Sequence, residues 1–258
     1  MQMRLNGILR RIIRCVMVCA ISGGMARAQA DEFPQRVDGD IGVGTYYVSR
    51  IVRGQANQVT ELPYGNFDYH RMFMRVDTLG LKTSKLGYGY LEITTKFNQD
   101  GFNTNGTRLL GFRSRQDSLP LGLGTLQTTS FGALLVHAYH DINKSGGNLF
   151  DMTYFSELDA RRLIFYPLAG AEYQSRNYVS YYYGVSNQEA ALSQYAVYHP
   201  GGAVNPFIGL MCDAKLTEKY HLNLYLGRKW LGNAIQSSPI VNKSVMDTGF
   251  IALAYRFE

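Results

Sequence analysis

The sequence lacks any apolar run long enough to cross a bilayer as a helix, and it has few cysteines. A transmembrane helix needs about 20 predominantly apolar residues, whereas the apolar stretch near the N-terminus, CVMVCAI, is far shorter. Of the three cysteines, Cys15 and Cys19 lie in the first 30 residues, so Cys212 has no partner for an internal disulfide if that segment is removed. The chain therefore reads neither as a helical membrane protein nor as a disulfide-stabilised secreted domain.

The first 30 residues have the composition of a secretory signal peptide. Residues 1–14 carry four arginines and no acidic residue, an apolar run follows, and SGGMARAQA supplies small residues for cleavage. This order is typical of a cleaved secretion signal. We expect cleavage after Ala30, with Ala28 as the alternative, which leaves residues 31–258 as one mature domain.

The mature part also lacks a charge excess. The whole chain has 26 basic and 20 acidic residues, but residues 1–30 hold five arginines and no acid, which leaves 21 against 20. Nucleic-acid binding requires a basic face on the domain itself, so this composition gives it no support. The remaining length suits one all-β domain.

The C-terminal stretch VMDTGFIALAYRFE alternates with a period of two, as a half-buried strand does. One face carries Gly249, Ile251, Leu253, Tyr255 and Phe257. The stretch resembles the terminal strand of bacterial outer-membrane barrels, whose closing aromatic residue helps the insertion machinery to recognise them. We predict that Leu253, Tyr255 and Phe257 form this barrel-insertion signal, although Phe257 here is followed by Glu258.

Other segments alternate in the same way, among them PFIGLMCDAKL, YHLNLYLGRKW, LFDMTYFSEL and GYGYLEITTKF. Charges such as Glu157 and Asp213 lie on the face opposite the apolar one, which suits a barrel with a polar lumen. A soluble β-sandwich would explain the alternation but not these charges. We predict an all-β protein: an antiparallel transmembrane β-barrel of about ten strands, with twelve as the alternative, in the outer membrane of a Gram-negative bacterium.

Short and long connections alternate along the predicted barrel, as periplasmic turns and outer loops do. The exception is 114–127, which is either an extended periplasmic turn or conceals further strands. The predicted short turns are 82–85, 159–162 and 217–219; the long loops are 53–66, 97–107, 140–148, 174–203 and 231–245; the strands are 40–52, 67–81, 86–97, 107–113, 128–139, 149–158, 162–173, 204–216, 220–230 and 246–257.

Three stretches carry a resemblance to a known family: YVSYYYGVSNQEA, YHLNLYLGRKWLGNAIQSSPIV and the closing GFIALAYRF. Together they are similar to the MipA/OmpV family of outer-membrane proteins, strongly over 160–258 and more loosely over 40–159. The matching residues are Tyr182, Tyr183, Gly184, Val185, Ser186, Glu189, Ala190, Ser238, Pro239, Ile240 and Val241.

The resemblance implies an outer-membrane barrel and several functions. A member of the family is regarded as a scaffold that joins a lytic transglycosylase to a peptidoglycan synthase, and others are described as antigens, adhesins or porin-like stress proteins. We therefore expect a scaffold for peptidoglycan-remodelling enzymes, embedded in outer-membrane lipids. The alternatives are a small gated pore, a ligand- or drug-binding porin-like protein, or a surface adhesin.

Both family motifs are predicted to lie in neighbouring outer loops. We expect Tyr182, Tyr183, Gly184, Val185, Ser186 and Glu189 to pack against Ser238 and Pro239 and to form a gate that partly closes the barrel. Gly184 would permit a turn of the chain into or across the pore. The plainer alternative is that the tyrosines are ordinary girdle and strand residues.

Catalytic and metal sites are not supported by the sequence. His137 and His140 lie three apart, which on a strand places their rings on opposite faces and prevents a shared metal. The chain has no G-x-S-x-G nucleophile motif, and LPLGLG lacks the lysine and helix of a phosphate loop. We expect no enzyme activity, cofactor or metal; Asp151, Glu157, Glu172 and Asp213 are read as lumen charges.

Overall fold

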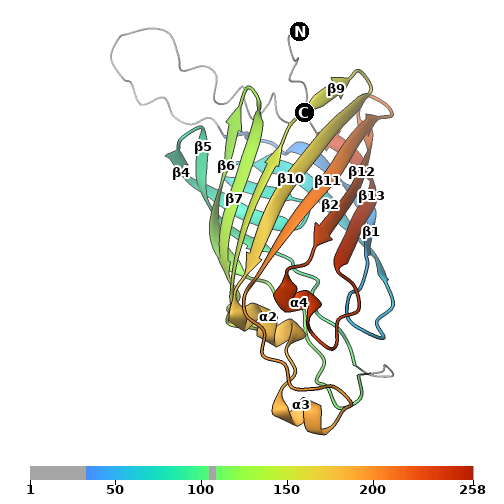
Figure 1. The fold of residues 1–258 in the computed structure, drawn as a ribbon. Coiled ribbons are helices and arrows are strands. Elements are labelled where there is room, and N and C mark those ends of the chain that lie inside the picture. The colour runs from blue at the N-terminus through green and yellow to red at the C-terminus, as the bar shows by residue number, and fades with distance from the viewer. Residues whose placement is uncertain (1–32, 105–108, 258) are drawn as a thin grey trace.

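The computed structural model describes residues 33–104 and 109–257, and these form a closed antiparallel β-barrel with short helices at one end (Figure 1). Strand β13 pairs with β1, and β10 pairs with both β8 and β11, which closes the sheet. The strands are β1 (Asp38–Val48), β2 (Gln58–Tyr69), β3 (Met72–Arg75), β4 (Thr78–Leu86), β5 (Gly89–Lys96), β6 (Leu121–Thr129), β7 (Gly132–His140), β8 (Asn148–Phe155), β9 (Leu158–Ala160), β10 (Leu163–Gln174), β11 (Ala203–Lys215), β12 (Tyr220–Trp230) and β13 (Val245–Phe257); the helices are α2 (Arg176–Tyr183), α3 (Asn187–Ala191) and α4 (Asn233–Gln236).

The wall has twelve strands, the number predicted from the sequence as the alternative to about ten. Although thirteen strands are distinguished, β9 continues β8 along the same neighbour: Phe155 is opposite Leu168 of β10, and Leu158 is opposite Phe165. The two segments therefore act as one wall strand interrupted by residues 156–157.

Several predicted boundaries are wrong. The predicted strand 67–81 is the end of β2, all of β3 and the start of β4, while 128–139 combines the end of β6 with β7. The predicted loop 53–66 contains residues 58–66 of β2, and residues 109–113 of the predicted strand 107–113 form no strand. The segment 114–127 is not a periplasmic turn, because its first part belongs to the loop 97–120 and its second part is β6.

The two faces of the wall follow the period-2 pattern. Outward side chains form an exposed apolar surface, as in a barrel embedded in lipid, and inward side chains include many buried polar groups. None of the helices among the described residues is long and apolar enough to span a membrane. Outward residues include Val43, Leu81, Leu123, Phe150, Ile208, Leu226, Ile251 and Leu253; inward residues include Asp40, Glu92, His137, Asp151, Glu172, Asp213 and Arg256.

The two ends of the barrel differ. One end carries short turns such as 70–71, 87–88, 130–131 and 161–162 together with the C-terminal end of β13, and the other carries the longer connections and the helices (Figure 1). Outer-membrane barrels place short turns in the periplasm and long loops outside. We therefore assign the end with the helices to the cell exterior. The predicted signal peptide, residues 1–30, lies outside the described residues.

Cys212 provides a direct test of the face assignment. It lies on β11 between Phe165 of β10 and Leu224 of β12, on the outward face with Leu210. We expect the folded protein in membranes to resist a charged, water-soluble maleimide, because lipid covers this thiol, whereas the unfolded protein should react completely.

The control places a thiol in water. In a Cys212→Ala background, Ser130→Cys on an exposed periplasmic turn should react rapidly with the same reagent. Fast labelling of Cys212 in the folded barrel, measured by mass spectrometry, would overturn the register of β11.

Candidate functional site

The outer end of the barrel is covered by a lid, which we define as residues 49–57, 97–104, 109–120, 141–147, 175–202 and 231–244. The lid has its own hydrophobic core, contributed by several separate segments of the chain. Burial of this many apolar side chains stabilises the lid as a packed layer instead of a set of loose loops. Members of the core include Ile51, Val52, Phe102, Leu109, Phe112, Tyr178, Val179, Tyr182, Tyr183, Val185, Leu231, Ile235, Ile240 and Val241.

The consecutive tyrosines belong to a helix, so the alternative of strand or girdle tyrosines is wrong. In α2, Tyr178 and Tyr182 are one turn apart, and their ring centroids lie 4.8 Å from one another. Successive residues are about 100° apart on a helix, so Tyr181, Tyr182 and Tyr183 point in three directions. Because lid segments surround α2, Tyr182 and Tyr183 are both buried and Tyr181 is half-buried.

The next helix begins with a capping box. The Ser186 side chain accepts a hydrogen bond from the Glu189 N–H (3.2 Å), and the Glu189 carboxylate accepts one from the Ser186 N–H (3.0 Å). These reciprocal bonds satisfy two backbone donors that a helix start otherwise leaves unpaired. Ser186 and Glu189 therefore define where α3 begins.

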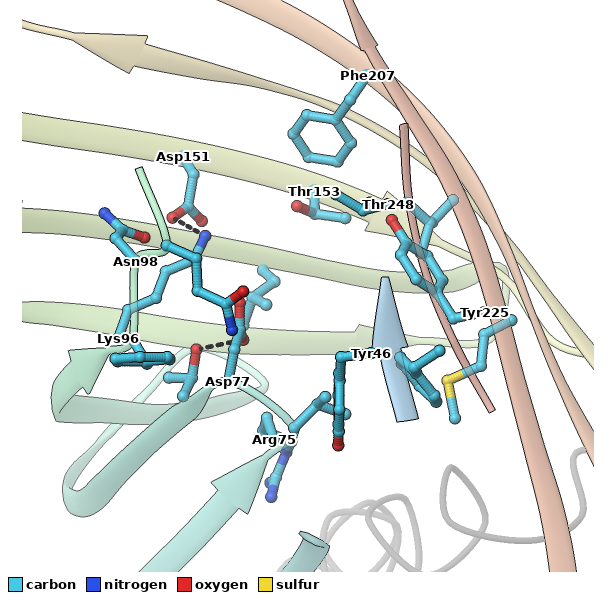
Figure 2. A pocket seen from close by; sticks show the side chains of 18 of the residues that line it. Tyr46, Arg75, Asp77, Lys96, Asn98, Asp151, Thr153, Phe207, Tyr225 and Thr248 are labelled. Atoms are coloured by element: carbon cyan, nitrogen blue, oxygen red, sulfur yellow. Dashed lines mark hydrogen bonds and ion pairs between the residues drawn. The ribbon is translucent and has the colours of Figure 1, made fainter. Parts of the chain in front are cut away.

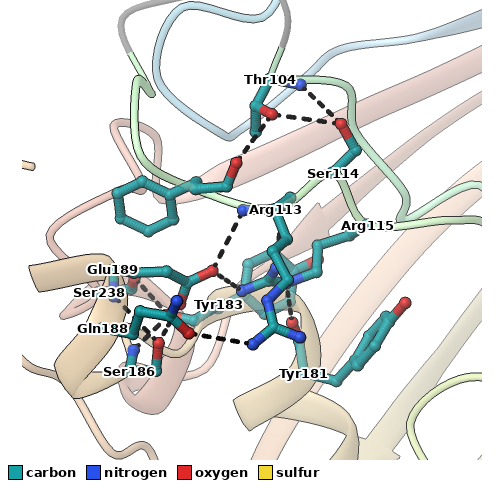
Figure 3. A network of polar contacts seen from close by, with 11 residues as sticks. Thr104, Arg113, Ser114, Arg115, Tyr181, Tyr183, Ser186, Gln188, Glu189 and Ser238 are labelled. Atoms are coloured by element: carbon teal, nitrogen blue, oxygen red, sulfur yellow. Dashed lines mark hydrogen bonds and ion pairs between the residues drawn. The ribbon is translucent and has the colours of Figure 1, made fainter. Parts of the chain in front are cut away.

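Arg115 links the loop 97–120 to both helices (Figure 3). Its guanidinium lies 2.5 Å from the Glu189 carboxylate and donates to the Tyr181 carbonyl at 2.6 Å. Burial raises the pKa of Glu189, but the hydrogen bonds from Ser186 and the interaction with Arg115 outweigh it, and the net pKa lies below its usual value. Glu189 is thus ionised wherever the lid is folded near neutral pH.

The second motif segment contacts the first. Ser238 donates a hydrogen bond to the Tyr183 carbonyl at 2.6 Å, and the Pro239 carbonyl accepts one from Arg53 at 2.9 Å. Gly184 has an ordinary φ of −74°, but an added Cβ would lie 2.4 Å from the Ser180 carbonyl. Its glycine is therefore explained by close packing against the end of α2, and not by a turn of the chain into the pore.

Beneath the lid, the lumen contains a cavity of about 850 Å³. Its lining is divided: Figure 2 shows Lys96, Asp77 and Asp151 on one side, and Tyr46 and Tyr225 on the other. This volume lies within the range of pockets that hold small molecules. The cavity can therefore accommodate a ligand with one polar and one apolar part.

Two ion pairs line the cavity, and Lys229 of the second pair is opposite Phe207 in the register of β11 and β12. Lys96 lies 3.7 Å from Asp151, and Lys229 lies 3.0 Å from Glu172. His137 contacts Asp151 at 3.1 Å, whereas His140 lies on the outer face, so the two histidines do not share a site. Within residues 33–104 and 109–257, no three His, Cys, Asp or Glu side chains are grouped to hold a metal ion.

A second charged cluster lies in the periplasmic half of the lumen. Arg256 of β13 forms two hydrogen bonds of 2.7 and 2.6 Å with Asp40 of β1, the residue directly opposite it in the register. It also donates to Asp213 at 2.7 Å, and Asp213 lies 2.6 Å from His221. The cluster thus joins the first and last strands of the barrel.

The predicted insertion residues all lie on β13. Leu253 and Phe257 are exposed on the outward face, and Tyr255 packs edge-on against Phe257, with ring centroids 4.8 Å apart, and against Tyr220 of β12. Their role in insertion stays a prediction.

The sequence also contains local signals for the two helices, α2 and α3, in the segment that was predicted as a loop. S-x-x-E at 186–189 is a capping-box pattern, and the i, i+4 spacing of Tyr178 and Tyr182 is helical. These two patterns predict α3 and α2. No local pattern marks Arg115 or the Asp40–Arg256 pair, because their partners are 74 and 216 positions away.

Comparisons with known proteins agree on one family. Residues 41–257 match the family model described as MltA-interacting protein MipA. Outer membrane protein Omp26La of Vibrio anguillarum is 25% identical over 225 residues, which cover 83% of this chain and 85% of that protein. Outer membrane protein OmpV of Vibrio cholerae is 27% identical over 202 residues (74% and 77%), and the MltA-interacting protein of Escherichia coli K12 is 23% identical over 262 residues (96% and 98%).

Proposed function

The chain belongs to the MipA family of outer-membrane β-barrel proteins, and we propose that it is a non-enzymatic scaffold that holds peptidoglycan-remodelling enzymes at the periplasmic face of the outer membrane. The partner in direct contact is a lytic transglycosylase, through which a peptidoglycan synthase is recruited. The name of the MltA-interacting relative, which is similar along almost the whole of this chain, supports this proposal.

The observation that carries the proposal is the charge of the periplasmic rim. Among the described residues, exposed cations at this end outnumber exposed anions, which are Asp159 and Glu218. A basic surface steers an acidic partner toward it and fixes its orientation. The lid residues lie at the opposite end, so they cannot contact the same partner. The exposed cations are Arg36, Arg71, Lys85, Arg161, Arg162 and Lys219.

A pull-down with matched variants tests the scaffold. The detergent-solubilised barrel should retain a lytic transglycosylase from envelope extract, and Arg162→Glu should reduce the retained amount by on the order of tenfold, because it reverses a charge at the rim. Mass spectrometry identifies and quantifies the retained proteins. The retained amount should also fall as salt is raised, since exposed charges are screened.

Arg176→Glu is the control, because Arg176 is equally exposed but lies in α2 at the outer end. It should leave retention unchanged. Equal loss from both variants, or the absence of any murein enzyme from the retained proteins, would contradict the proposal.

A second candidate function is a small-solute pore gated by the lid. It is favoured by the cavity that lies directly below the lid, lined by Asn98, Gln99 and Asp100 at its outer end. In this function the lid must open for a solute to pass, and the lid variants described in the Discussion test that requirement.

A further inference from the structure

The barrel wall has a gap on its outer half, between β2 and β5. The hairpin β3–β4 stops early: β3 has four residues, and residues 76–77 turn back to β4. Val76 adopts φ +56°, a left-handed conformation that is unfavourable for a β-branched residue. It is held there by a hydrogen bond from its N–H to the Gly65 carbonyl.

The first half of β2 has a strand on one side only. Residues 58–65 pair with β1, whereas β3 pairs with residues 66–69, and no other described strand pairs with residues 58–64. This unpaired stretch runs roughly 20 Å beyond the turn at 76–77. On the other side of the gap, residues 97 and 98 continue β5 into the loop 97–120. There Asn98 pairs with Ser118 of the returning part of the loop.

The unpaired edge carries the residues expected of a true edge. Gly65 directs its carbonyl toward the β3 side, and backbone groups alternate along a strand, so residues 59, 61 and 63 face the same way. Residue 63 is a proline, which has no N–H to leave unpaired, and residue 61 is an exposed glutamate. Proline and charge are the features that natural edge strands use.

The cavity extends to both borders of this gap. It is lined by Leu62 and Pro63 on β2, by Val76 at the turn and by Phe97 and Gln99 on the far side. Its lining also includes Met74, Leu79 and Thr95, whose side chains lie on the outer face by register. The cavity therefore reaches β2, the turn 76–77 and residues 97–99, which border the gap.

Apart from Glu61 and Asp77, the surroundings of the gap on the outer surface are apolar. Val59, Leu79, Phe97 and Leu119 are exposed there, as is typical of the lipid-facing belt. At the lid end of the barrel, Arg50 closes the gap by donating hydrogen bonds to the carbonyls of Gln99 and Gly101. The gap is therefore a window bordered by β2, the turn 76–77 and residues 97–101, and it faces lipid.

We propose that this window is a lateral entrance through which a single-chain amphiphile passes between the lipid layer and the lumen cavity. The apolar chain would contact the aromatic wall formed by Tyr46, Phe207, Tyr225 and Phe250, and the polar head would contact the ion pairs of Lys96 and Lys229. Unpaired backbone in a membrane is tolerated where it borders a hydrated cavity, which agrees with an open window. This binding site does not depend on the scaffold function, although it lies in the same cavity that the pore function would use.

Quenching of a lumen tryptophan tests the proposal. The variant Trp230→Phe with Phe207→Trp places one tryptophan in the cavity, on β11. In lipid nanodiscs, a fatty acid brominated along its chain, or a brominated lysophosphatidylcholine, should quench this tryptophan in a saturable manner. Either head group supports the site, and the comparison shows which one it prefers.

Two substitutions of equal size separate the entrance from the cavity. Leu62→Tyr at the border of the window should slow the onset of quenching by on the order of tenfold, whereas Leu126→Tyr, which adds the same volume to the cavity from β6 and outside the border of the window, should not. Gel mobility with and without heating verifies that each variant is folded. The absence of saturable quenching, equal slowing by both substitutions, or the same quenching by brominated two-chain lipid would overturn the proposal. None of these outcomes depends on retention of a murein enzyme.

Discussion

Replacing Arg256 with methionine is expected to lower the free energy of unfolding of the barrel by about 3–5 kcal/mol. Arg256 is 9% exposed and Asp40 is fully buried, so the substitution leaves two buried carboxylates, Asp40 and Asp213, without their cation. The pair also joins β1 to β13 at the seam of the barrel. Unfolding by urea, followed by fluorescence and by gel mobility, measures the change.

A second ion pair provides the matched control. Arg228 and Asp247 also join neighbouring strands, β12 and β13, with bonds of 2.6 and 3.0 Å, but their side chains are 54% and 41% exposed. An exposed pair contributes about 0–1 kcal/mol, so Arg228→Met should have little effect. Similar losses from the two variants would show that burial of the Arg256 cluster does not determine its contribution.

The double variant Asp40→Asn with Arg256→Met separates the pair from its surroundings. Removing the negative charge of Asp40 should recover part of the stability lost in Arg256→Met, because less buried charge remains unpaired. An additive loss would mean that the two side chains do not interact in the folded barrel.

Replacing Glu189 with alanine is expected to open the lid while the barrel stays intact. The substitution removes both the ion pair with Arg115 and one half of the capping box of α3. Loss of a buried ion pair costs about 3 kcal/mol, which corresponds to lid cleavage on the order of a hundredfold faster when proteolysis tracks the opened population. Limited trypsin digestion, read by mass spectrometry, locates the cuts.

Glu189→Gln separates the two contributions. Glutamine retains the capping-box geometry but lacks the charge that pairs with Arg115, so cleavage should fall between the wild type and Glu189→Ala. Cuts within the barrel strands, or unchanged cleavage in both variants, would contradict the assigned role of Glu189.

The lid should also loosen in acid. Because the pKa of Glu189 is lowered in the folded protein, its contribution to stability is fully present above the unfolded pKa of about 4.3 and is lost as the pH falls through the folded value. The near-ultraviolet circular dichroism of the α2 tyrosines should therefore weaken below about pH 4. This step should be absent from Glu189→Gln.

The same variants test the gated-pore function. If the lid gates a pore, Glu189→Ala in planar bilayers should conduct more often than the wild type, because the closed population is smaller. A lid that is cleaved rapidly but leaves conductance unchanged would remove the pore as a function and would leave the scaffold proposal unaffected.

Much of the barrel could be predicted from the sequence because the pattern that specifies a strand face is local. Alternation placed Leu253 outside and Asp213 inside without any knowledge of their neighbours, and the lumen charges followed from it. The strand number could not be predicted with the same certainty. A four-residue strand such as β3 is too short to show a period, and residues 58–66 resemble a loop because they contain proline and polar residues of an unpaired edge.

The sequence by itself thus determined an outer-membrane barrel of ten or twelve strands and the inner and outer face of its wall. The two faces could be assigned because side chains two positions apart on a strand lie on the same face. Only the tertiary structure decided how the barrel closes, how the lid packs and where the wall is open. Asp40 and Arg256 are 216 positions apart, and Tyr183 and Ser238 are 55 apart. Such contacts arise from the folded path of the chain, and the window exists because a neighbouring hairpin ends early, which no feature of β2 alone specifies.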